Sequence, residues 1–192
     1  MKTITGVIIL AAGSSSRLGQ PKQNLVYKDK TLLQRTIETA MASVCDPVIV
    51  VLGANSEAIK PTIVNTDAII VQNNEWSEGM ASSIRAGIVE LRKISLDVKS
   101  VILMLCDQPF VDTYLLNLLI LAKSKQGITV TSYNDTIGAP VLFDAIYFDE
   151  LLQLKGTEGA KKLIQKYPDA VIEIPFPLAG VDVDTIEDFE RL

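Results

Sequence analysis

Short, almost wholly apolar runs alternate along the chain with longer segments in which apolar residues recur at helical spacing. Runs that are apolar at nearly every position are typical of strands buried on both faces, as in a parallel sheet covered by helices. Helical spacing is clearest at 31–43 and 80–91, and Asp112 is placed to cap a third helix. The pattern predicts an α/β fold. The predicted strands are 7–10, 48–52, 68–71, 101–105 and 128–130.

After residue 133 the alternation becomes less regular. The chain continues with GAPVLF at 138–143, a helix-like FDELLQL, the segment GTEGAKKLIQKY and a short apolar run at 171–174. We expect these segments to extend the same sheet and to include an antiparallel strand. With 192 residues and no linker-like or low-complexity stretch, residues 1–192 are predicted to form one domain.

Composition excludes several functions. The net charge of −5 argues against a protein that coats nucleic acid. No apolar stretch is long enough to span a bilayer and no signal peptide is recognisable, so we expect no membrane partner and a cytoplasmic location. The chain has no histidine, which excludes a Ser-His-Asp triad, a histidine general base and a histidine-ligated zinc site. Cys45 and Cys106 have no disulfide or metal-ligand pattern and are expected to be buried.

The first predicted strand leads directly into the loop LAAGSSSRLGQPK, residues 10–22. In an open parallel sheet, ligands bind at the carboxyl ends of the strands. Gly13 and its small neighbours let the backbone curl around an anion, and Arg17 and Lys22 supply positive charge. The spacing fits neither a Walker A loop nor a dinucleotide fingerprint. The loop therefore suggests a triphosphate cradle, although turn residues of this kind also occur in an ordinary solvated loop.

Acidic residues follow two other apolar segments. Asp107 stands directly after the run ending at 105, where a carboxylate can hold a Mg²⁺ that bridges phosphate oxygens, or can simply belong to the turn before Pro109. Asp182 and Asp184 have strand-like spacing and would complete the metal site from one face of an edge strand. The alternative is a polar surface leading to a helix capped by Asp184 or Thr185.

Taken together, LAAGxSxRxGxPK, the later DQP and the late DVDTxED resemble the nucleotidyltransferases that activate sugar phosphates, isoprenoid precursors and the molybdenum cofactor. Within the MobA-like NTP transferases of this group, the pattern is most similar to the molybdenum cofactor cytidylyltransferases. The features are LAAG in place of LAGG, the stretch NxxWxxGMxxSIRxG from Asn73 to Gly87, and GxPVLF followed by GxxGAK. Thr157 and Lys161 stand where relatives have an acid and an arginine, and Ala139 where they have a histidine.

The resemblance implies a three-layer Rossmann-like fold and Mg²⁺-dependent transfer of CMP from CTP to the phosphate of molybdopterin, with release of pyrophosphate. A sugar phosphate or another small phosphorylated acceptor, or a non-catalytic module that delivers cofactor, is the alternative. Transient contact with a molybdenum hydroxylase client or its chaperone is a further expectation. Arg17, Lys22 and Asp107 are the expected catalytic residues, and Asp107, Asp182 and Asp184 the expected metal ligands. Expected substrate-binding residues are Leu10, Ala11, Ala12, Gly13, Ser14, Ser15, Ser16, Asn73, Gly79, Met80, Ser82, Ser83, Gly138, Pro140 and Lys161.

Overall fold

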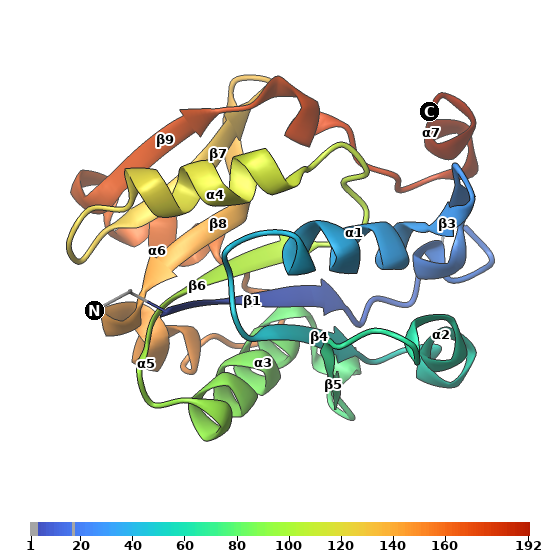
Figure 1. The fold of residues 1–192 in the computed structure, drawn as a ribbon, viewed down its shortest axis with the longest axis horizontal. Coiled ribbons are helices and arrows are strands. Elements are labelled where there is room, and N and C mark those ends of the chain that lie inside the picture. Colours follow the sequence, from blue (N-terminus) through green and yellow to red (C-terminus); the bar gives the residue numbers. More distant parts are fainter. Residues whose placement is uncertain (1–3, 17) are drawn as a thin grey trace.

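The computed structural model describes residues 4–16 and 18–192, and its centre is a seven-stranded sheet (Figure 1). The strand order is β5-β4-β1-β6-β8-β7-β9. β8 is antiparallel to both of its neighbours, whereas every other pair in the sheet is parallel, which confirms the predicted antiparallel strand. The bounds are β1 Ile4–Ala11, β4 Val48–Leu52, β5 Ile69–Gln72, β6 Val98–Leu105, β7 Ile128–Tyr133, β8 Thr136–Asp144 and β9 Val171–Pro175. β2 (Val26–Tyr27) and β3 (Lys30–Thr31) form a separate small hairpin.

The reversal at β8 has a local cause. β7 and β8 are joined by Asn134 and Asp135, whose φ angles are both positive at 47° and 56°. Two successive left-handed residues form the two-residue turn that fits the twist of a β-hairpin, and asparagine and aspartate tolerate this conformation best after glycine. The turn sends β8 back between β6 and β7, so residues 137–141 reach the sheet edge where β6 ends.

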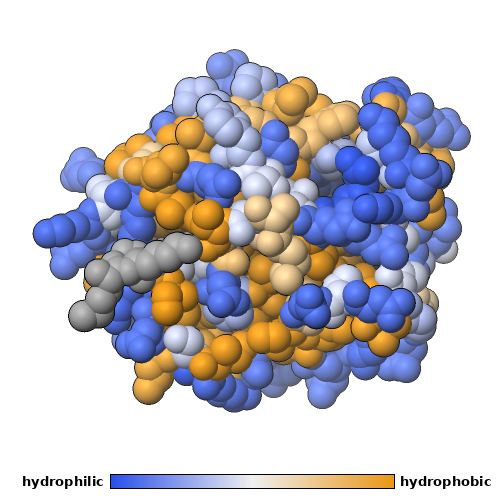
Figure 2. Space-filling view, in the orientation of Figure 1, coloured by the Kyte–Doolittle hydropathy of each residue, from blue (hydrophilic) through white to orange (hydrophobic). Residues whose placement is uncertain are grey.

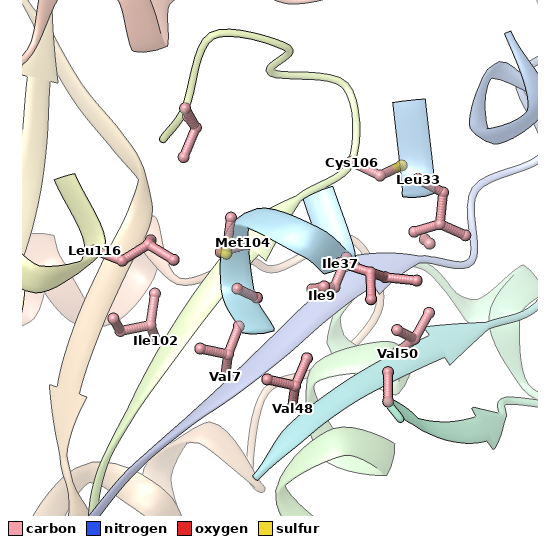
Figure 3. Close-up of a cluster of buried hydrophobic side chains, with 14 of the residues drawn as sticks. Val7, Ile9, Leu33, Ile37, Val48, Val50, Ile102, Met104, Cys106 and Leu116 are labelled. Carbon is pink, nitrogen blue, oxygen red and sulfur yellow. The ribbon is translucent and has the colours of Figure 1, made fainter. Parts of the chain in front are cut away.

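Helices cover both faces of the sheet, giving the three layers that the resemblance implies. Their bounds are α1 Leu32–Met41, α2 Ser56–Ile63, α3 Met80–Ile94, α4 Thr113–Ala122, α5 Phe148–Leu151, α6 Lys161–Lys166 and α7 Ile186–Glu190. Helices α1, α2 and α4 pack on the face that carries Val7 and Ile9, part of which is drawn in Figure 3. Helices α3, α5 and α6 pack on the face that carries Ile8. Successive residues of β1 thus pack into cores on opposite faces of the sheet, which explains why residues 7–11 are all apolar.

The helix starts follow from their capping residues. The Thr31 hydroxyl accepts from the Gln34 N–H at 3.1 Å while the Gln34 side chain accepts from the Thr31 N–H, a reciprocal cap that begins α1. Asp112 Oδ1 accepts from the Leu115 N–H at 2.9 Å, confirming the predicted cap of α4. Cys45 and Cys106 are buried and unpaired, as expected.

Helix α4 has no charged residue, and only one of its sides packs on the sheet. Its opposite side is exposed, with Tyr114 and Leu121 among the most accessible large apolar residues, and apolar side chains gather over it in Figure 2. None of its residues lines either of the two cavities described below. In residues 4–16 and 18–192, no helix combines the length and apolar character needed to cross a bilayer.

Candidate active site

The loop after β1 is shaped by a glutamine that the sequence reasoning did not single out. Gln23 is 1% exposed, and its Nε2 donates to the carbonyl oxygens of Ala11 at 2.8 Å and Gly13 at 3.2 Å. The Ala12 carbonyl accepts from the Ala54 N–H at 3.0 Å. Three successive carbonyls are therefore turned toward the protein, and in trans peptides the N–H groups point the opposite way. Ser15 Oγ accepts from the Lys22 N–H at 3.0 Å and brings the end of the loop back to its beginning.

Lys22 lies between two carboxylates that come from distant parts of the chain. Its Nζ is 2.6 Å from Asp107 Oδ2, just after β6, and 2.9 Å from Asp184 Oδ1, just before α7. It also donates to the Val183 carbonyl at 3.3 Å. β1 and β6 are neighbouring parallel strands, with Leu10 paired to Leu105, so their loops leave the sheet at the same edge. The loop after β1 and Asp107 therefore meet at that edge.

The charges at this edge are strongly coupled. Burial disfavours the charged form of Lys22, but the neighbouring Asp107 carboxylate, with Asp184, outweighs it and the net pKa of the ammonium is raised. Lys22 therefore stays protonated and acts as a fixed positive charge. Partial desolvation, with the charges of Asp184 and Asp107, raises the pKa of Asp182, although the residue as a whole is exposed. Burial also raises the pKa of the Cys106 thiol to about 12, which excludes a thiolate nucleophile at this position.

A cavity of about 370 Å³, here called the loop cavity, opens beside these charges. Its walls are the start of the loop, the turn Trp76–Met80, and the strand end at Asp107. Asn73 fixes the first turn of α3 beside this turn, because its Nδ2 donates to the hydroxyls of Ser82 at 2.8 Å and Ser83 at 3.0 Å. The predicted residues that line the loop cavity are Leu10, Ala11, Ala12, Gly13, Ser14, Lys22, Gly79, Met80, Ser83 and Asp107.

A second cavity of about 270 Å³ adjoins the first, and Leu10, Met80 and Leu105 line both. We call it the apolar cavity, because apart from Thr157 and Lys161 its side chains are aliphatic or absent. Lys161 Nζ contacts the Thr136 hydroxyl at 3.4 Å. The residues of its wall are Leu10, Met80, Ile84, Leu103, Leu105, Ile137, Gly138, Ala139, Val141, Thr157, Gly159, Ala160, Lys161 and Ile164.

Several of the predicted site residues are not among the residues that line the two cavities. Arg17 is outside the described residues, so its predicted role stays a prediction. Pro140 is buried, and its carbonyl accepts from the Thr131 hydroxyl at 2.7 Å. Pro140 does not line the apolar cavity, and the loop cavity is not lined by Ser15, Ser16, Asn73 or Ser82.

The predicted edge strand through Asp182 and Asp184 is wrong, since the structure assigns no strand to residues 181–184. The Val183 N–H donates to the Asp107 carbonyl at 2.9 Å, so the segment is fixed to the loop after β6 and not to a sheet neighbour. Thr185, one of the two candidate caps, caps α7. The bond from Val183 to Asp107 and the burial of Val183 hold the segment where Asp184 contacts Lys22, while Asp182 is exposed.

Sequence reasoning also missed Gln108. It is 5% exposed, and its Nε2 donates to the carbonyls of Ala179 at 2.7 Å and Ala139 at 3.0 Å, which fixes the segment after Asp107 to β8. Gln23 and Gln108 each stand next to a charged residue that was predicted, Lys22 and Asp107. A buried amide that holds backbone carbonyls has no sequence pattern of its own, and proximity to a motif is the only available signal.

The donor set at Asp107 fits a divalent cation. Asp107 Oδ1 is buried and has no hydrogen-bond partner, so one oxygen of a buried carboxylate is left for a ligand. In the described ranges 4–16 and 18–192, no group of three or more histidine, cysteine or acidic side chains could form a complete protein cage. Mg²⁺ is usually held by one or two carboxylates together with substrate phosphates and water, so Asp107 and Asp184 suit that mode of binding.

Comparison with known proteins identifies the family. The profile described as the MobA-like NTP transferase domain matches residues 7–171, which include the lining residues of both cavities but not Asp184. The chain belongs to the MobA-like NTP transferase family. Like other members, it is a nucleotidyltransferase with a Rossmann-like fold.

Two relatives and one solved structure show how this MobA-like protein relates to others. It is 32% identical to nicotine blue oxidoreductase of Paenarthrobacter nicotinovorans, over 98% of this chain and 96% of the relative. It is 24% identical to molybdenum cofactor cytidylyltransferase of Escherichia coli (strain K12), over 95% and 92%. The crystal structure of Rv0371c from Mycobacterium tuberculosis H37Rv matches with a TM-score of 0.85 and 31% identity, covering 100% of this chain and 98% of that one. Rv0371c has also been solved in complex with manganese.

Proposed function

We propose that this MobA-like protein transfers CMP from CTP to the terminal phosphate of molybdopterin and releases pyrophosphate, with Mg²⁺ as its cofactor. The observation that carries the proposal is the position of Lys22, held between Asp107 and Asp184 at the wall of the loop cavity, with the apolar cavity directly adjoining. Positive charge, carboxylates and a second compartment are what transfer between two phosphorylated substrates requires.

The loop supports the triphosphate part of the proposal. Gln23 and the Ala54 N–H bind the carbonyls of residues 11–13, and residues 11–14 line the loop cavity, so we infer that the N–H edges of these peptides face the cavity. Backbone N–H groups of this kind, with cationic side chains, bind phosphate oxygens. We propose that Arg17 holds the β- and γ-phosphates and that Lys22 neutralises charge growing on the α-phosphate. The LAAG sequence favours CTP over GTP only through the family resemblance.

The reaction needs no protein nucleophile. An oxygen of the acceptor phosphate attacks the α-phosphorus of CTP in line, a new phosphorus–oxygen bond forms, and the bond to the β-phosphate oxygen breaks with departure of pyrophosphate. The acceptor already carries charged oxygens at neutral pH, so no group has to remove a proton, and the absence of histidine is no obstacle. The chain aligns the two substrates and neutralises their charge. Asp107 and Asp184 would hold Mg²⁺, which, when bound, adds further neutralisation of the phosphate oxygens.

The lining of the apolar cavity favours an acceptor with a planar ring over a carbohydrate. Its walls offer aliphatic side chains such as Ile84, Leu103 and Ile137. The hydroxyl groups of a sugar would lose their hydrogen bonds to water there without replacement, at a cost of about 1–3 kcal/mol each. A planar heterocycle buries its faces favourably and keeps its polar edge toward the opening. Lys161 lines the same cavity and is proposed to contact the anionic part of the acceptor.

The relatives add one supporting and one competing indication. The Escherichia coli relative bears the name molybdenum cofactor cytidylyltransferase, which agrees with the proposed reaction. The relative named nicotine blue oxidoreductase is more similar in sequence and favours a second candidate, an oxidoreductase acting on nicotine blue or a related compound. Manganese in the Rv0371c complex agrees with a divalent cation at this fold.

A pyrophosphate-release screen separates the candidates. The purified protein is incubated with Mg²⁺ and each of the four nucleoside triphosphates, against molybdopterin, hexose 1-phosphates and phosphorylated polyols. The proposal predicts release with CTP and molybdopterin together and little with either alone. Release with a sugar phosphate would support the other acceptor class, and saturable CTP binding without release would support a delivery module. Turnover of nicotine blue with a hydride donor, in the absence of any nucleotidyl transfer, would support the oxidoreductase.

A further inference from the structure

Arg85 of α3 and Glu78 of the turn Trp76–Met80 form an ion pair that also bonds to residues 154–156. Arg85 Nη1 donates to Glu78 Oε1 at 2.8 Å, and Nη2 donates to Glu78 Oε2, so the pair is bidentate. The same Nη1 donates to the Leu154 carbonyl at 2.8 Å, and Glu78 Oε1 also accepts from the Gly156 N–H at 3.0 Å. Two of these four hydrogen bonds, the one to the Leu154 carbonyl and the one from the Gly156 N–H, therefore connect the pair to residues 154–156. We call this arrangement the clasp.

Beneath the clasp the two segments meet backbone to backbone. The Ala81 N–H donates to the Gly156 carbonyl at 3.2 Å. Gly79 has a φ of +125°, and a Cβ there would lie 2.5 Å from the Gly156 oxygen. A Cβ on Gly159 would lie 2.8 Å from the Met80 sulfur. Glycine is thus needed at position 79, where the backbone of residues 156 and 157 leaves no room for a side chain.

The two clasped segments belong to different cavities. Trp76, Ser77 and Gly79 line the loop cavity, whereas Thr157, Gly159 and Lys161 line the apolar cavity. Met80 lines both, and it lies directly against Gly159. A shift of either segment would change the distance between the ligands bound in the two cavities. Nucleotidyl transfer is sensitive to such shifts, because misplacement by about 1 Å can lower a rate about a hundredfold.

We propose that the Arg85–Glu78 clasp is a positioning device that couples the nucleotide compartment to the acceptor compartment and sets their relative placement. Arg85 and Glu78 are positioning residues, since neither is expected to touch the reacting atoms. The proposal rests on the proposed function in placing a nucleotide in the loop cavity. The clasp also transmits binding: a nucleotide that orders the turn Trp76–Met80 orders residues 154–160 through it.

Hydrogen exchange of the intact protein tests the clasp without any assumption about the acceptor. In Arg85→Met, the amides of 76–81 and 154–160 are expected to exchange about tenfold faster than in the wild type. The reason is that the free energy of local opening falls by about the net contribution of one hydrogen bond. Arg92→Met is the matched control, since Arg92 lies on the same helix and pairs with Asp149 of α5 at 2.8 Å, outside the clasp. Unchanged exchange at 154–160 in Arg85→Met would overturn the proposal.

Addition of CTP and Mg²⁺ tests the coupling. In the wild type and in Arg92→Met both segments are expected to become protected, whereas in Arg85→Met protection is expected at 76–81 and lost at 154–160. Protection of 154–160 in Arg85→Met equal to the wild type would show that the coupling does not run through the clasp. If CTP protects neither segment in the wild type, the proposed function fails at its nucleotide, and the exchange rates without ligand still decide whether the clasp joins the segments.

Kinetics separate positioning from a purely structural role. With CTP and the acceptor that the screen identifies, Arg85→Met is expected to lower kcat at least about tenfold while KM for CTP changes less than about threefold. Arg85→Lys should recover part of kcat, because a lysine keeps one charged hydrogen bond of the bidentate pair. Glu78→Gln, which keeps an acceptor for the Gly156 N–H, should fall between these variants. A wild-type kcat in folded Arg85→Met would refute the assignment.

Discussion

The substitution Lys22→Met probes the charge arrangement at the active site most sharply. Methionine keeps the length and the apolar contacts of the lysine stem but removes the ammonium. In the structure that ammonium contacts Asp107 Oδ2 at 2.6 Å and Asp184 Oδ1 at 2.9 Å, and Asp107 Oδ1 has no other partner. The variant would therefore leave a buried carboxylate with neither oxygen bound by protein.

Two magnitudes follow. Leaving a buried charged group unpaired costs about 1–3 kcal/mol of folding free energy. For a chain of this size that corresponds to a fall in Tm of about 2–12 °C. If Lys22 neutralises charge in the transition state, its loss raises the barrier by about 2.7–4 kcal/mol, by analogy with loss of one oxyanion-hole donor. Turnover would then fall about 100- to 1000-fold. The second effect is far larger than the unfolded fraction could produce at 25 °C.

Differential scanning fluorimetry and pyrophosphate release measure the two effects separately. The matched control is Lys123→Met, because Lys123 Nζ lies 3.0 Å from Asp144 Oδ2 and the two side chains are 13% and 16% exposed, against 16% and 16% for Lys22 and Asp107. Both variants should lose stability, but only Lys22→Met should lose turnover. Mn²⁺ should raise the Tm of Lys22→Met more than that of the wild type, since the Asp107 carboxylate loses its ammonium partner. Equal turnover in Lys22→Met and the wild type would refute the reasoning.

Three further predictions concern single residues. Asp107→Asn should abolish Mg²⁺-dependent turnover while far-UV circular dichroism stays unchanged, because the residue lies at a strand end; turnover with a metal dependence like that of the wild type would remove Asp107 from the site. Gly79→Ala should lower the free energy of unfolding in urea by about 1–3 kcal/mol, since its φ is strained for alanine and the added Cβ would meet backbone. The control Gly13→Ala, with nothing within 4 Å of the added Cβ, should fold normally. Equal stability of the two variants would contradict this reasoning. The hydrogen bonds from Arg85 and the Gly156 N–H lower the pKa of Glu78 from 4.5 to about 2, so its stabilising contribution is complete above pH 4.5 and is lost as pH falls toward 2. The stability difference between the wild type and Glu78→Gln should therefore shrink over that range, and a difference that grows on acidification would oppose the assigned pairing.

Much of the fold could be predicted from the sequence because its strands are buried on both faces. Val7, Ile8 and Ile9 are fully buried, and a strand of that kind requires an unbroken apolar run. Asp112 was recognisable as a cap because the capping bond is local, spanning three residues. The loop after β1 was recognisable for the same reason, since a strand end followed by glycine, serine and cations is a contiguous pattern.

What the sequence did not reveal depends on contacts between distant residues. Lys22 and Asp184 are 162 positions apart; the motif resemblance placed both in one site, but nothing in the pattern around either residue shows their direct contact. The segment through Asp182 has strand-like spacing, but one backbone bond from Val183 to the loop after β6 fixes it outside the sheet. Glu78 and Arg85 are near in sequence and resemble an ordinary surface pair, and only the contacts with Leu154 and Gly156 show that they connect two cavities.

A crystal structure with CTP and Mn²⁺, in which anomalous scattering locates the metal, tests the central claim most directly. The account predicts that the triphosphate lies along residues 10–16 in the loop cavity. It also predicts that the Mn²⁺ ion located by the anomalous peak is bonded to Asp107 Oδ1 and to a phosphate oxygen. A nucleotide bound outside the loop cavity, or a metal that contacts neither Asp107 nor Asp184, would contradict it.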